Sequence, residues 1–392
     1  MFAFPIFTNM EELHVDIIIL GAGPAGSTLT AYLKDSGHSI AVIDKAHFPR
    51  DKVCGDAIPG PAVRILRGIS PATSQRFDAF QHKRLSRGGT AIAPNHTAFS
   101  IQFQTEGYIS KRIDFDNFLF EEAKLNQHAH FFLGETITDI ENKDASVTLS
   151  LKNSGLQIKA KMIIGCDGAN SVVVRKFVKR AINRAHHCGA VRAYFEHVQM
   201  QDESMMEFYF LKGYLPGYFW VFPLENNCFN LGFGMLSKDI SERKINLKES
   251  LKSLIANDPL VKEAFREAKL IGNIKGFGLP LGSMKRAISG NRFLLCGDAA
   301  ALIDPATGEG IGNAMISAKI AAEHIIQCFE KNRFDAAFNK AYDKAVYQKL
   351  WRQLRMKYLI QKFLKDRYWL LNFIINRAAK NPWLRKIIGK IF

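Results

Sequence analysis

The segment VDIIILGAGPAGSTLTAYLKDSGHSIAVID, residues 15–44, restricts the possible folds of this 392-residue chain more than any other part of it. Its β-branched and amphipathic runs predict a buried strand, a glycine-rich turn, a helix and a second strand. The three regular elements are expected over 15–20, 24–37 and 39–44. A βαβ unit with this turn predicts a parallel sheet of the Rossmann type that binds a dinucleotide.

The turn has the form Gly21-x-Gly23-x-x-Gly26, and each glycine has a physical role. Gly21 permits the tight turn, Gly23 lets the backbone approach a pyrophosphate, and Gly26 allows close packing of the helix. Asp44 ends the second strand, where its carboxylate accepts hydrogen bonds from ribose hydroxyls. An acid at this position favours FAD or NAD over NADP.

A second glycine-rich stretch, FLLCGDAAALIDPATGEGIGNAM, occupies residues 293–315. It predicts a strand that ends at Gly297 and Asp298, and a helix that begins near Gly310 with free backbone amides. A flavin needs a carboxylate for its ribitol hydroxyls and a positive helix end near the N1–O2 edge of its ring. We expect Asp298 in the first role and the turn Thr307–Gly310 in the second. The alternative is an ordinary strand–helix turn in a second Rossmann-type unit.

The composition, with 47% hydrophobic residues, is typical of a globular protein. The six cysteines show neither C-x-x-C pairing nor zinc-ligand spacing, and the start of the chain lacks the pattern of a secretory leader. We therefore expect a cytoplasmic protein without a metal site.

The net charge of +16 is concentrated near the end of the chain, since residues 340–392 contain 14 Lys or Arg and only two acids. A basic excess favours nucleic acid or an anionic membrane surface as a partner, and the chain contains no recognisable nucleic-acid-binding module. Apolar residues recur at helical spacing over 334–358, which predicts a long amphipathic helix. The longest apolar run beyond it, YWLLNFII, is far shorter than the roughly 20 residues of a spanning helix.

Two interpretations of this tail stay open. Its aromatic and basic residues are suited to the interface of an anionic membrane, which would place the protein at the inner face of the membrane. Alternatively, the tail is a helical cap whose apolar stripe packs on the nucleotide-binding domain. The two interpretations are compatible.

The sequence resembles the geranylgeranyl reductase family of FAD-dependent oxidoreductases, within the larger group built on the p-hydroxybenzoate hydroxylase fold. The resemblance covers roughly residues 13–330. It rests on GAGPAG (21–26), FPRDKVCGD (48–56), GCDGANS (165–171), GYFWVFP (217–223) and GDAAALIDPATGEGI (297–311). The last string is the most specific, because DP-x-TGEGI departs from the P-x-G-G-Q-G-x-N pattern of the related aromatic hydroxylases.

Alternating, aromatic-rich runs over 186–275 predict an antiparallel sheet. Together with the resemblance, they indicate a mixed α/β fold with a Rossmann-type FAD-binding domain, an antiparallel β-sheet substrate domain and a helical C-terminal tail. We assign 1–60, 105–185 and 276–330 to the FAD-binding domain, 61–104 and 186–275 to the substrate domain, and 331–392 to the tail.

The resemblance implies that Arg112 lies close to a non-covalently bound FAD, Asp167 near its pyrophosphate, and Cys54 and Gly55 beside the isoalloxazine ring. A structural role stays open for three of them: a buried cysteine without chemistry, a surface ion pair for Arg112 and an Asp-Gly turn for Asp167. The expected cofactor-binding residues are Gly21, Gly23, Pro24, Ala25, Gly26, Asp44, Lys45, Lys52, Cys54, Gly55, Arg112, Asp167, Gly297, Asp298, Pro305, Gly308, Gly310 and Ile311.

The substrate side is expected at residues 216–234. Tyr218, Trp220 and Phe222 alternate along a strand, so they share one face and either line an apolar pocket or pack within the sheet. Cys54, Tyr218 and Trp220 are the candidate catalytic residues, and no proton donor is identified. Flavin-dependent halogenases carry a related W-x-W-x-I-P string, from which this chain departs at Tyr218 and Phe222.

The resemblance therefore implies an FAD-dependent reductase of carbon–carbon double bonds in an isoprenoid lipid or a similar apolar molecule. The alternatives are a flavin monooxygenase or halogenase acting on an aromatic or small metabolite, and an FAD-bearing binding module without turnover. The chain has no second GxGxxG motif, so the reductant, NAD(P)H or an electron-carrier protein, stays open.

Overall fold

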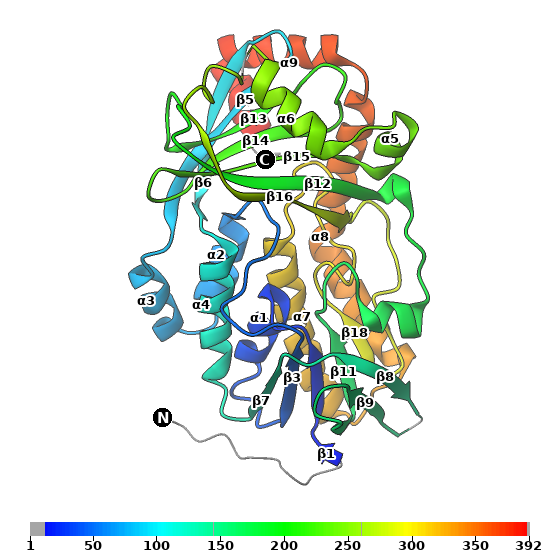
Figure 1. Cartoon of the computed structure of the whole chain (residues 1–392). Coiled ribbons are helices and arrows are strands. Elements are labelled where there is room, and N and C mark those ends of the chain that lie inside the picture. The colour runs from blue at the N-terminus through cyan, green and yellow to red at the C-terminus, as the bar shows by residue number, and fades with distance from the viewer. Residues whose placement is uncertain (1–11, 144, 260, 390–392) are drawn as a thin grey trace.

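The computed structural model describes residues 12–143, 145–259 and 261–389 (Figure 1). Residues 1–11 of the predicted FAD-binding domain and 390–392 of the predicted tail lie outside these ranges. A six-stranded sheet and a larger eight-stranded sheet lie at opposite ends of the molecule, joined by long segments of chain (Figure 1).

The six-stranded sheet is the Rossmann-type sheet. Its strands run in the order β17-β18-β11-β2-β3-β7, and only the edge strand β17 is antiparallel to its neighbour. Their bounds are β2 Ile17–Leu20, β3 Ile40–Asp44, β7 Ala129–Leu133, β11 Met162–Gly165, β17 Ser289–Gly290 and β18 Phe293–Leu295. The helices α1 Pro24–Tyr32, α4 Arg112–Lys124 and α7 Ile311–Glu330 pack beside it.

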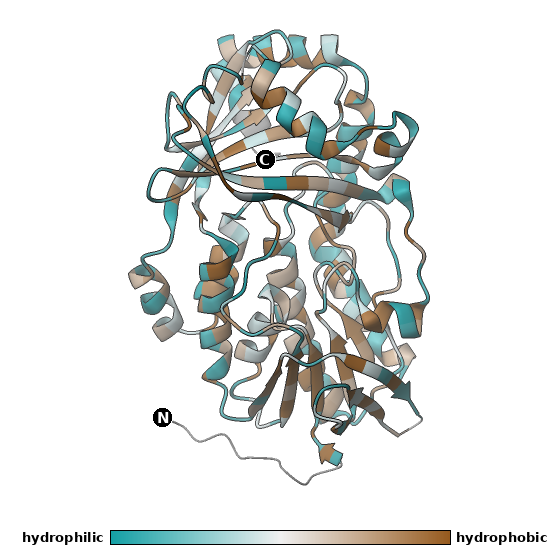
Figure 2. Ribbon diagram, in the orientation of Figure 1, coloured by the Kyte–Doolittle hydropathy of each residue, from teal (hydrophilic) through white to brown (hydrophobic). Residues whose placement is uncertain are grey.

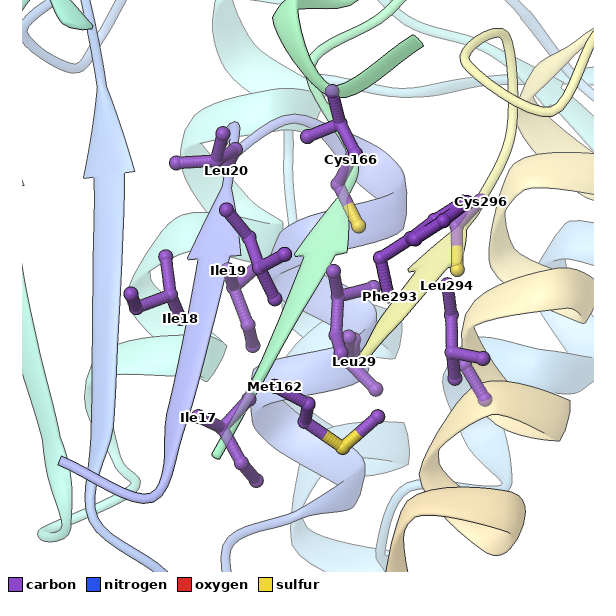
Figure 3. Close-up of a cluster of buried hydrophobic side chains, with 14 of the residues drawn as sticks. Ile17, Ile18, Ile19, Leu20, Leu29, Met162, Cys166, Phe293, Leu294 and Cys296 are labelled. Carbon is purple, nitrogen blue, oxygen red and sulfur yellow. The ribbon is translucent and has the colours of Figure 1, made fainter. Parts of the chain in front are cut away.

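The strands of this sheet are apolar on both faces because helices and loops cover both sides. Ile17, Ile18 and Ile19 are fully buried, and Met162 and Leu294 pack beside them (Figure 3). In Figure 2 the strands of this end of the molecule are accordingly coloured as hydrophobic. The predicted helix over 24–37 is shorter than expected, since α1 ends at Tyr32 and a turn follows.

The eight-stranded sheet has the order β16-β12-β15-β14-β13-β5-β6-β4, and among these pairs only β13 and β5 run parallel. Its strands are β4 Ala57–Ile58, β5 Arg84–Ile92, β6 Ala98–Ile109, β12 His187–Glu196, β13 Met205–Tyr209, β14 Tyr218–Pro223, β15 Cys228–Leu236 and β16 Lys269–Pro280. The helices α5 Ser237–Glu242 and α6 Leu247–Asn257 lie against this sheet, whereas α2 Gly60–Arg67 and α3 Pro71–Ala79 pack with α4 and α7.

A four-stranded sheet of order β1-β10-β9-β8 lies next to the Rossmann-type sheet. It comprises β1 Glu12–His14, β8 Ile137–Asn142, β9 Val147–Leu151 and β10 Gln157–Ala160. Short helical turns at Val174–Val178 and Arg184–His186 lead from the Rossmann-type sheet to β12.

The C-terminal region folds into α8 Ala336–Leu364, α9 Tyr368–Lys380 and α10 Pro382–Gly389. The expected apolar stripe of α8, which includes Tyr342, Val346 and Leu350, packs into the core of the Rossmann-type sheet. The helix then runs from the Rossmann-type sheet toward the eight-stranded sheet, where α9 lies beside β6 (Figure 1). These arrangements confirm the predicted fold class.

Candidate functional site

A cavity of about 1180 Å³ lies between the Rossmann-type sheet and the eight-stranded sheet. Both glycine-rich segments line it, together with the aromatic face of β14. Pockets for single small molecules commonly measure about 300–1,000 Å³, so this cavity has room for a cofactor and a second molecule.

The first glycine-rich turn is shaped by contacts that exclude a side chain. A Cβ at Gly21 would lie 2.4 Å from the carbonyl oxygen of Cys166, and φ of Gly21 is +94°. A Cβ at Gly26 would lie 1.8 Å from the carbonyl oxygen of Gly21. Gly26 therefore sets the packing of α1 and does not line the cavity, whereas Gly21 and Gly23 do. This turn can accommodate a pyrophosphate at the N-terminus of α1.

Two carboxylates flank this turn. Asp44 Oδ2 accepts a hydrogen bond from the amide of Ala22 at 2.8 Å, so the acid also fixes the turn itself. Asp167 Oδ2 accepts from the amide of Val172 at 2.6 Å, while Oδ1 is buried without a partner among the described residues. Burial raises the pKa of Asp167 above its ordinary value. An unpaired buried acceptor at the cavity wall fits a ligand that supplies a hydrogen-bond donor.

The second glycine-rich segment follows β18 and contributes Gly297 and Asp298 to the cavity. A Cβ at Gly297 would lie 2.9 Å from Cβ of Ala314, which explains the close approach of this turn to α7. Lys52 Nζ lies 3.9 Å from Asp298 Oδ2 and 4.3 Å from the centre of the Phe277 ring. Burial lowers the pKa of Lys52, and Asp298 opposes that change.

The loop before α7 is organised by two acids that were not among the predicted site residues. Asp304 Oδ1 accepts from the amides of Ala306 and Thr307 at 2.9 and 3.1 Å. Glu309 accepts from the amide of Gly312, and burial raises the pKa of Glu309 to about 7. The amide of Gly312 is therefore not free as the sequence had suggested, because the preceding side chain caps it.

Helix α8 holds this loop in place from the other side. Lys357 Nζ lies 2.7 Å from Asp304 Oδ2, and both side chains are buried, with 4% and 6% of their surface exposed. One turn further along, Gln361 Nε2 donates to the carbonyl of Pro305 at 2.7 Å. The C-terminal region thus forms part of the site itself, which the sequence did not indicate.

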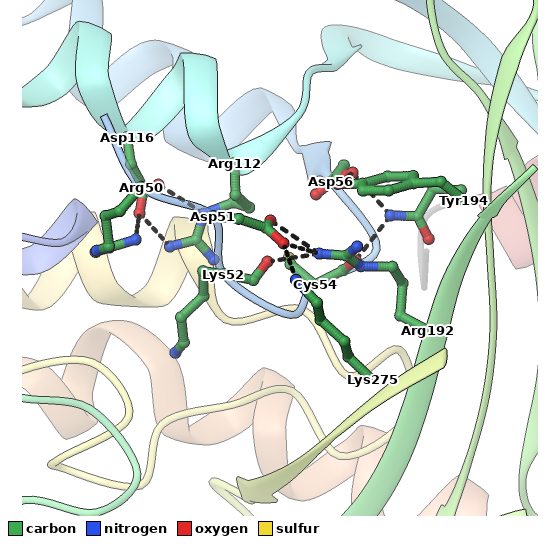
Figure 4. Close-up of polar contacts among 11 residues, drawn as sticks. Arg50, Asp51, Lys52, Cys54, Asp56, Arg112, Asp116, Arg192, Tyr194 and Lys275 are labelled. Carbon is green, nitrogen blue, oxygen red and sulfur yellow. Dashed lines mark hydrogen bonds and ion pairs between the residues drawn. The ribbon is translucent and has the colours of Figure 1, made fainter. Parts of the chain in front are cut away.

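Arg112 is a buried residue, so the expected alternative of a surface ion pair is wrong. Its guanidinium forms a bidentate pair with Asp116 at 2.6 and 2.7 Å, and Arg50 donates to the same carboxylate at 2.7 Å (Figure 4). Burial raises the pKa of the neighbouring Cys54, although Arg112 opposes this change. Cys54 therefore faces the cavity as a neutral thiol.

A second polar network lies behind Cys54 (Figure 4). Asp56 Oδ2 accepts from Tyr194 Oη at 2.7 Å and from Asn230 Nδ2 at 2.8 Å. Asn230 Oδ1 in turn accepts from Trp220 Nε1 at 2.9 Å, and Asn230 Nδ2 also donates to the carbonyl of Cys54. Asp56 Oδ1 is buried without a partner in the described chain, and burial raises the pKa of Asp56 to about 6.

The aromatic face of β14 forms the opposite wall. Tyr218, Trp220 and Phe222 all line the cavity, as their alternation predicts, with successive ring centres 5.9 and 6.2 Å apart. Tyr218 donates its hydroxyl proton to the carbonyl of Thr307, which connects β14 to the loop before α7. Burial raises the pKa of Tyr218, so the phenol stays protonated.

The structure therefore gathers the predicted residues in one place. All of the predicted cofactor-binding and catalytic residues except Gly26 line the same cavity. The sequence did not single out Asp56, Asp304, Glu309, Tyr194, Asn230, Lys357 or Gln361. The first three belong to the quoted strings KVCGD and DPATGEG, whereas the others come from distant segments without a local signal.

The fold and the site together define a dinucleotide-binding flavoprotein. The family model described as "FAD binding domain" matches residues 14–333, and the chain belongs to this family. It is an FAD-dependent oxidoreductase of the geranylgeranyl reductase type, as its sequence predicted.

Among its relatives, a menaquinone reductase from Mycobacterium tuberculosis is 30% identical over 79% of this chain and 76% of its own length. A digeranylgeranylglycerophospholipid reductase from Methanococcus vannielii is 28% identical over 95% of this chain and 92% of its own.

Solved structures share the fold. A geranylgeranyl bacteriochlorophyll reductase-like protein from Thermoplasma acidophilum has a TM-score of 0.81 at 22% identity, over 97% of this chain and 100% of its own. A flavin-dependent brominase has a TM-score of 0.79 at 22% identity, over 97% of this chain and 93% of its own. The fold therefore occurs in both reductases and halogenating enzymes.

Replacing Lys357 with Met should strongly destabilise the protein, because it leaves the carboxylate of Asp304 buried without its counter-charge. We expect the free energy of unfolding to fall by about 3–5 kcal/mol. Lys362→Met, at an exposed position on the same helix, should change it by less than about 0.5 kcal/mol. Urea unfolding of the two variants measures the difference, and equal effects would contradict the assigned role of the ion pair.

Replacing Asp56 with Asn should change how stability depends on pH. In the native wild-type protein the carboxyl of Asp56 keeps its proton up to about pH 6, whereas in the unfolded chain it loses that proton near pH 3.8. The stabilisation that this raised pKa contributes is fully present below the unfolded pKa, and it is lost as the pH rises through the folded pKa. A shift of this size corresponds to roughly 3 kcal/mol. Chemical unfolding between these pH values should show the variant losing less stability than the wild type, and parallel curves would contradict the prediction.

Proposed function

We propose that this protein uses FAD to reduce carbon–carbon double bonds in the isoprenoid chain of a lipid or quinone. The observation that carries the proposal is a single cavity whose dinucleotide-binding end continues into an apolar aromatic end. That apolar end includes Phe99, Ile101, Phe103, Phe208 and Phe210. A long apolar chain requires such a lining, whereas a polar metabolite leaves it unsatisfied.

The names of the relatives support the same substrate class. One group is named for menaquinone and another for digeranylgeranylglycerophospholipid, and both molecules carry a polyprenyl chain. Likeness to halogenating enzymes concerns the fold alone, at 22% identity for the brominase. Among the residues that the structure describes, no helix is long and apolar enough to span a membrane.

In this proposal the two glycine-rich segments hold opposite ends of the cofactor. Gly21 and Gly23 hold its pyrophosphate with the N-terminus of α1, and Asp298 accepts from its ribitol hydroxyls. The loop held by Lys357 supports the ring. FAD, when bound, supplies the hydride chemistry, and the protein positions the acceptor and excludes water.

Hydride addition to an alkene requires a proton on the second carbon. Cys54 is a neutral thiol at the cavity wall, and Asp56 lies behind it with a free carboxylate oxygen. We infer that the Cys54 sulfur holds the proton that the substrate receives and that Asp56 replenishes it. Trp220, held by Asn230, and Phe222 keep the apolar chain against the site.

A single-turnover reaction without oxygen tests this function. Holoprotein reduced with dithionite is mixed with a digeranylgeranyl phospholipid or with menaquinone, and mass spectrometry follows the addition of two hydrogens per double bond. We expect saturation of the isoprenoid chain and reoxidation of the flavin. Product that forms only after oxygen is admitted would indicate a monooxygenase or halogenase, and reduced flavin that stays inert would contradict the proposal.

We further propose that the C-terminal region lies on an anionic membrane surface. Many of the large exposed hydrophobic side chains occur between Met356 and Ile387, and lysines and arginines surround them. These side chains are Met356, Leu359, Phe363, Tyr368, Trp369, Phe373, Trp383 and Ile387. Helix α9 buries Leu371 and Ile375 against the region of β6, so its opposite side remains free to meet lipid.

Trp369→Ser combined with Phe373→Ser should weaken binding to vesicles that contain phosphatidylglycerol by about tenfold or more, because two interfacial anchors are lost. Leu270→Ser combined with Ile271→Ser removes comparably exposed side chains from β16 and should leave binding unchanged. Co-sedimentation measures both, with pure phosphatidylcholine vesicles as the reference for charge. Equal binding of the two double variants would contradict this surface.

A further inference from the structure

A second hollow, separate from the cavity, lies on the surface where the segment 283–288 meets the first half of α8. It is open to solvent and measures about 760 Å³. Its lining residues include Lys285, Arg286, Lys344, Tyr347, Trp351 and Arg352. We call this hollow the cationic recess.

The cationic recess carries an excess of positive charge. Lys285, Arg286, Lys344 and Arg352 line it, and Asp343 is the one acidic lining residue in the part of the chain that the structure describes. Asp343 Oδ2 accepts from the amide of Ile288 at 3.3 Å, and burial raises the pKa of this acid. One oxygen of this acid is therefore engaged by the backbone, and the four basic residues outnumber it.

The backbone of Arg286 is fixed by Tyr347, whereas its guanidinium lacks a counter-charge among the described residues. The hydroxyl of Tyr347 accepts from the Arg286 amide and donates to the Arg286 carbonyl, each at 2.8 Å. The guanidinium of Arg286 has no ion pair or hydrogen bond within the described chain, and Arg180 lies close by, donating to the carbonyl of Ala287 at 2.9 Å. Burial and the charge of Arg180 both lower the pKa of Arg286.

Two like charges that are partly removed from water cost free energy unless an anion neutralises them. The aromatic residues of the recess add a second element. Lys285 Nζ lies 5.7 Å from the centre of the Tyr347 ring and 5.3 Å from that of Trp351, and these two rings pack edge to face. Guanidinium groups bind phosphoryl oxygens in a bidentate manner, and aromatic rings stack on planar groups.

We propose that the cationic recess binds a phosphoryl group, carried either by a nucleotide or by a phospholipid. The recess lies close to the large cavity, so a nucleotide bound in the recess could take part in the reaction. Leu281 lines the large cavity and Lys285 lines the recess, four residues later. Four residues span at most about 14 Å, so a molecule anchored by its phosphates in the recess is near the cavity. The proposal does not depend on which substrate the cavity binds.

Calorimetric titration of the holoprotein with inorganic pyrophosphate tests the recess. We expect saturable binding with one site, weakened at least tenfold by Arg286→Gln, because this change removes a charge-assisted contact. Arg266→Gln, at an exposed position paired with Glu263, should leave binding unchanged. Circular dichroism establishes that each variant is folded. Absence of saturable binding, or equal binding by Arg286→Gln and the wild type, would overturn the proposal.

Further titrations distinguish the sources of the phosphoryl group. NADPH that binds more tightly than pyrophosphate, with an affinity lowered by Arg286→Gln and by Trp351→Leu, identifies a nucleotide. Binding to phosphatidic acid vesicles that Arg286→Gln weakens, with no such effect on NADPH, identifies a phospholipid. Either result supports a phosphoryl site. If sodium chloride at matched ionic strength displaces pyrophosphate from wild type and Arg286→Gln alike, the attraction is unspecific and the proposal fails.

Discussion

Strands β18, β11 and β2 lie side by side and run parallel, so their carboxyl ends meet at one edge of the sheet. The turns that follow them begin at Gly297, Cys166 and Gly21, which are distant in sequence and adjacent in space. This geometry is the general reason why ligands bind at the carboxyl edge of open parallel sheets. Here it joins the two glycine-rich segments into one site, and the eight-stranded sheet closes that site from the other side.

The site depends on buried charges that are paired in different ways. Asp116 is held by two guanidiniums and Asp304 by an ammonium, so both carboxylates remain compatible with a dry interior. Asp56 is fully buried, and burial raises its pKa to about 6 although the hydrogen bonds from Asn230 and Tyr194 oppose that change. The buried layer behind the cavity therefore contains paired charges that hold its shape and one carboxyl, Asp56, whose pKa is raised by burial.

The C-terminal region connects the interior with the surface. Helix α8 contributes Tyr342 to the core and Lys357 to the loop before α7, and its exposed side carries Leu359. The same helix borders the cationic recess through Tyr347. A segment that looked like an appended basic tail is thus structurally continuous with the cofactor site, and it presents a basic, aromatic exterior where α9 follows.

The sequence by itself determined the elements whose signal is local. The turn Gly21–Gly26 is recognisable from the local spacing of its glycines, and the buried strands are recognisable because both of their faces are apolar. Alternate residues of a strand point to the same face, so the alternation of Tyr218, Trp220 and Phe222 correctly placed these three side chains together. The Rossmann-type unit and part of the site followed from these short-range patterns, whereas Cys54, Gly55, Arg112 and Asp167 were implied by the family resemblance.

Only the tertiary structure decided which distant groups meet. Lys357 is one of many lysines in a basic segment, and nothing near it in sequence distinguishes it from the exposed Lys362. Its partner, Asp304, lies 53 residues away. Tyr194 and Asn230 likewise reach Asp56 from strands more than a hundred residues further along the chain. Pairings of this kind depend on how sheets and helices pack, because the free energy of a buried charge is set by neighbours that the local sequence does not contain.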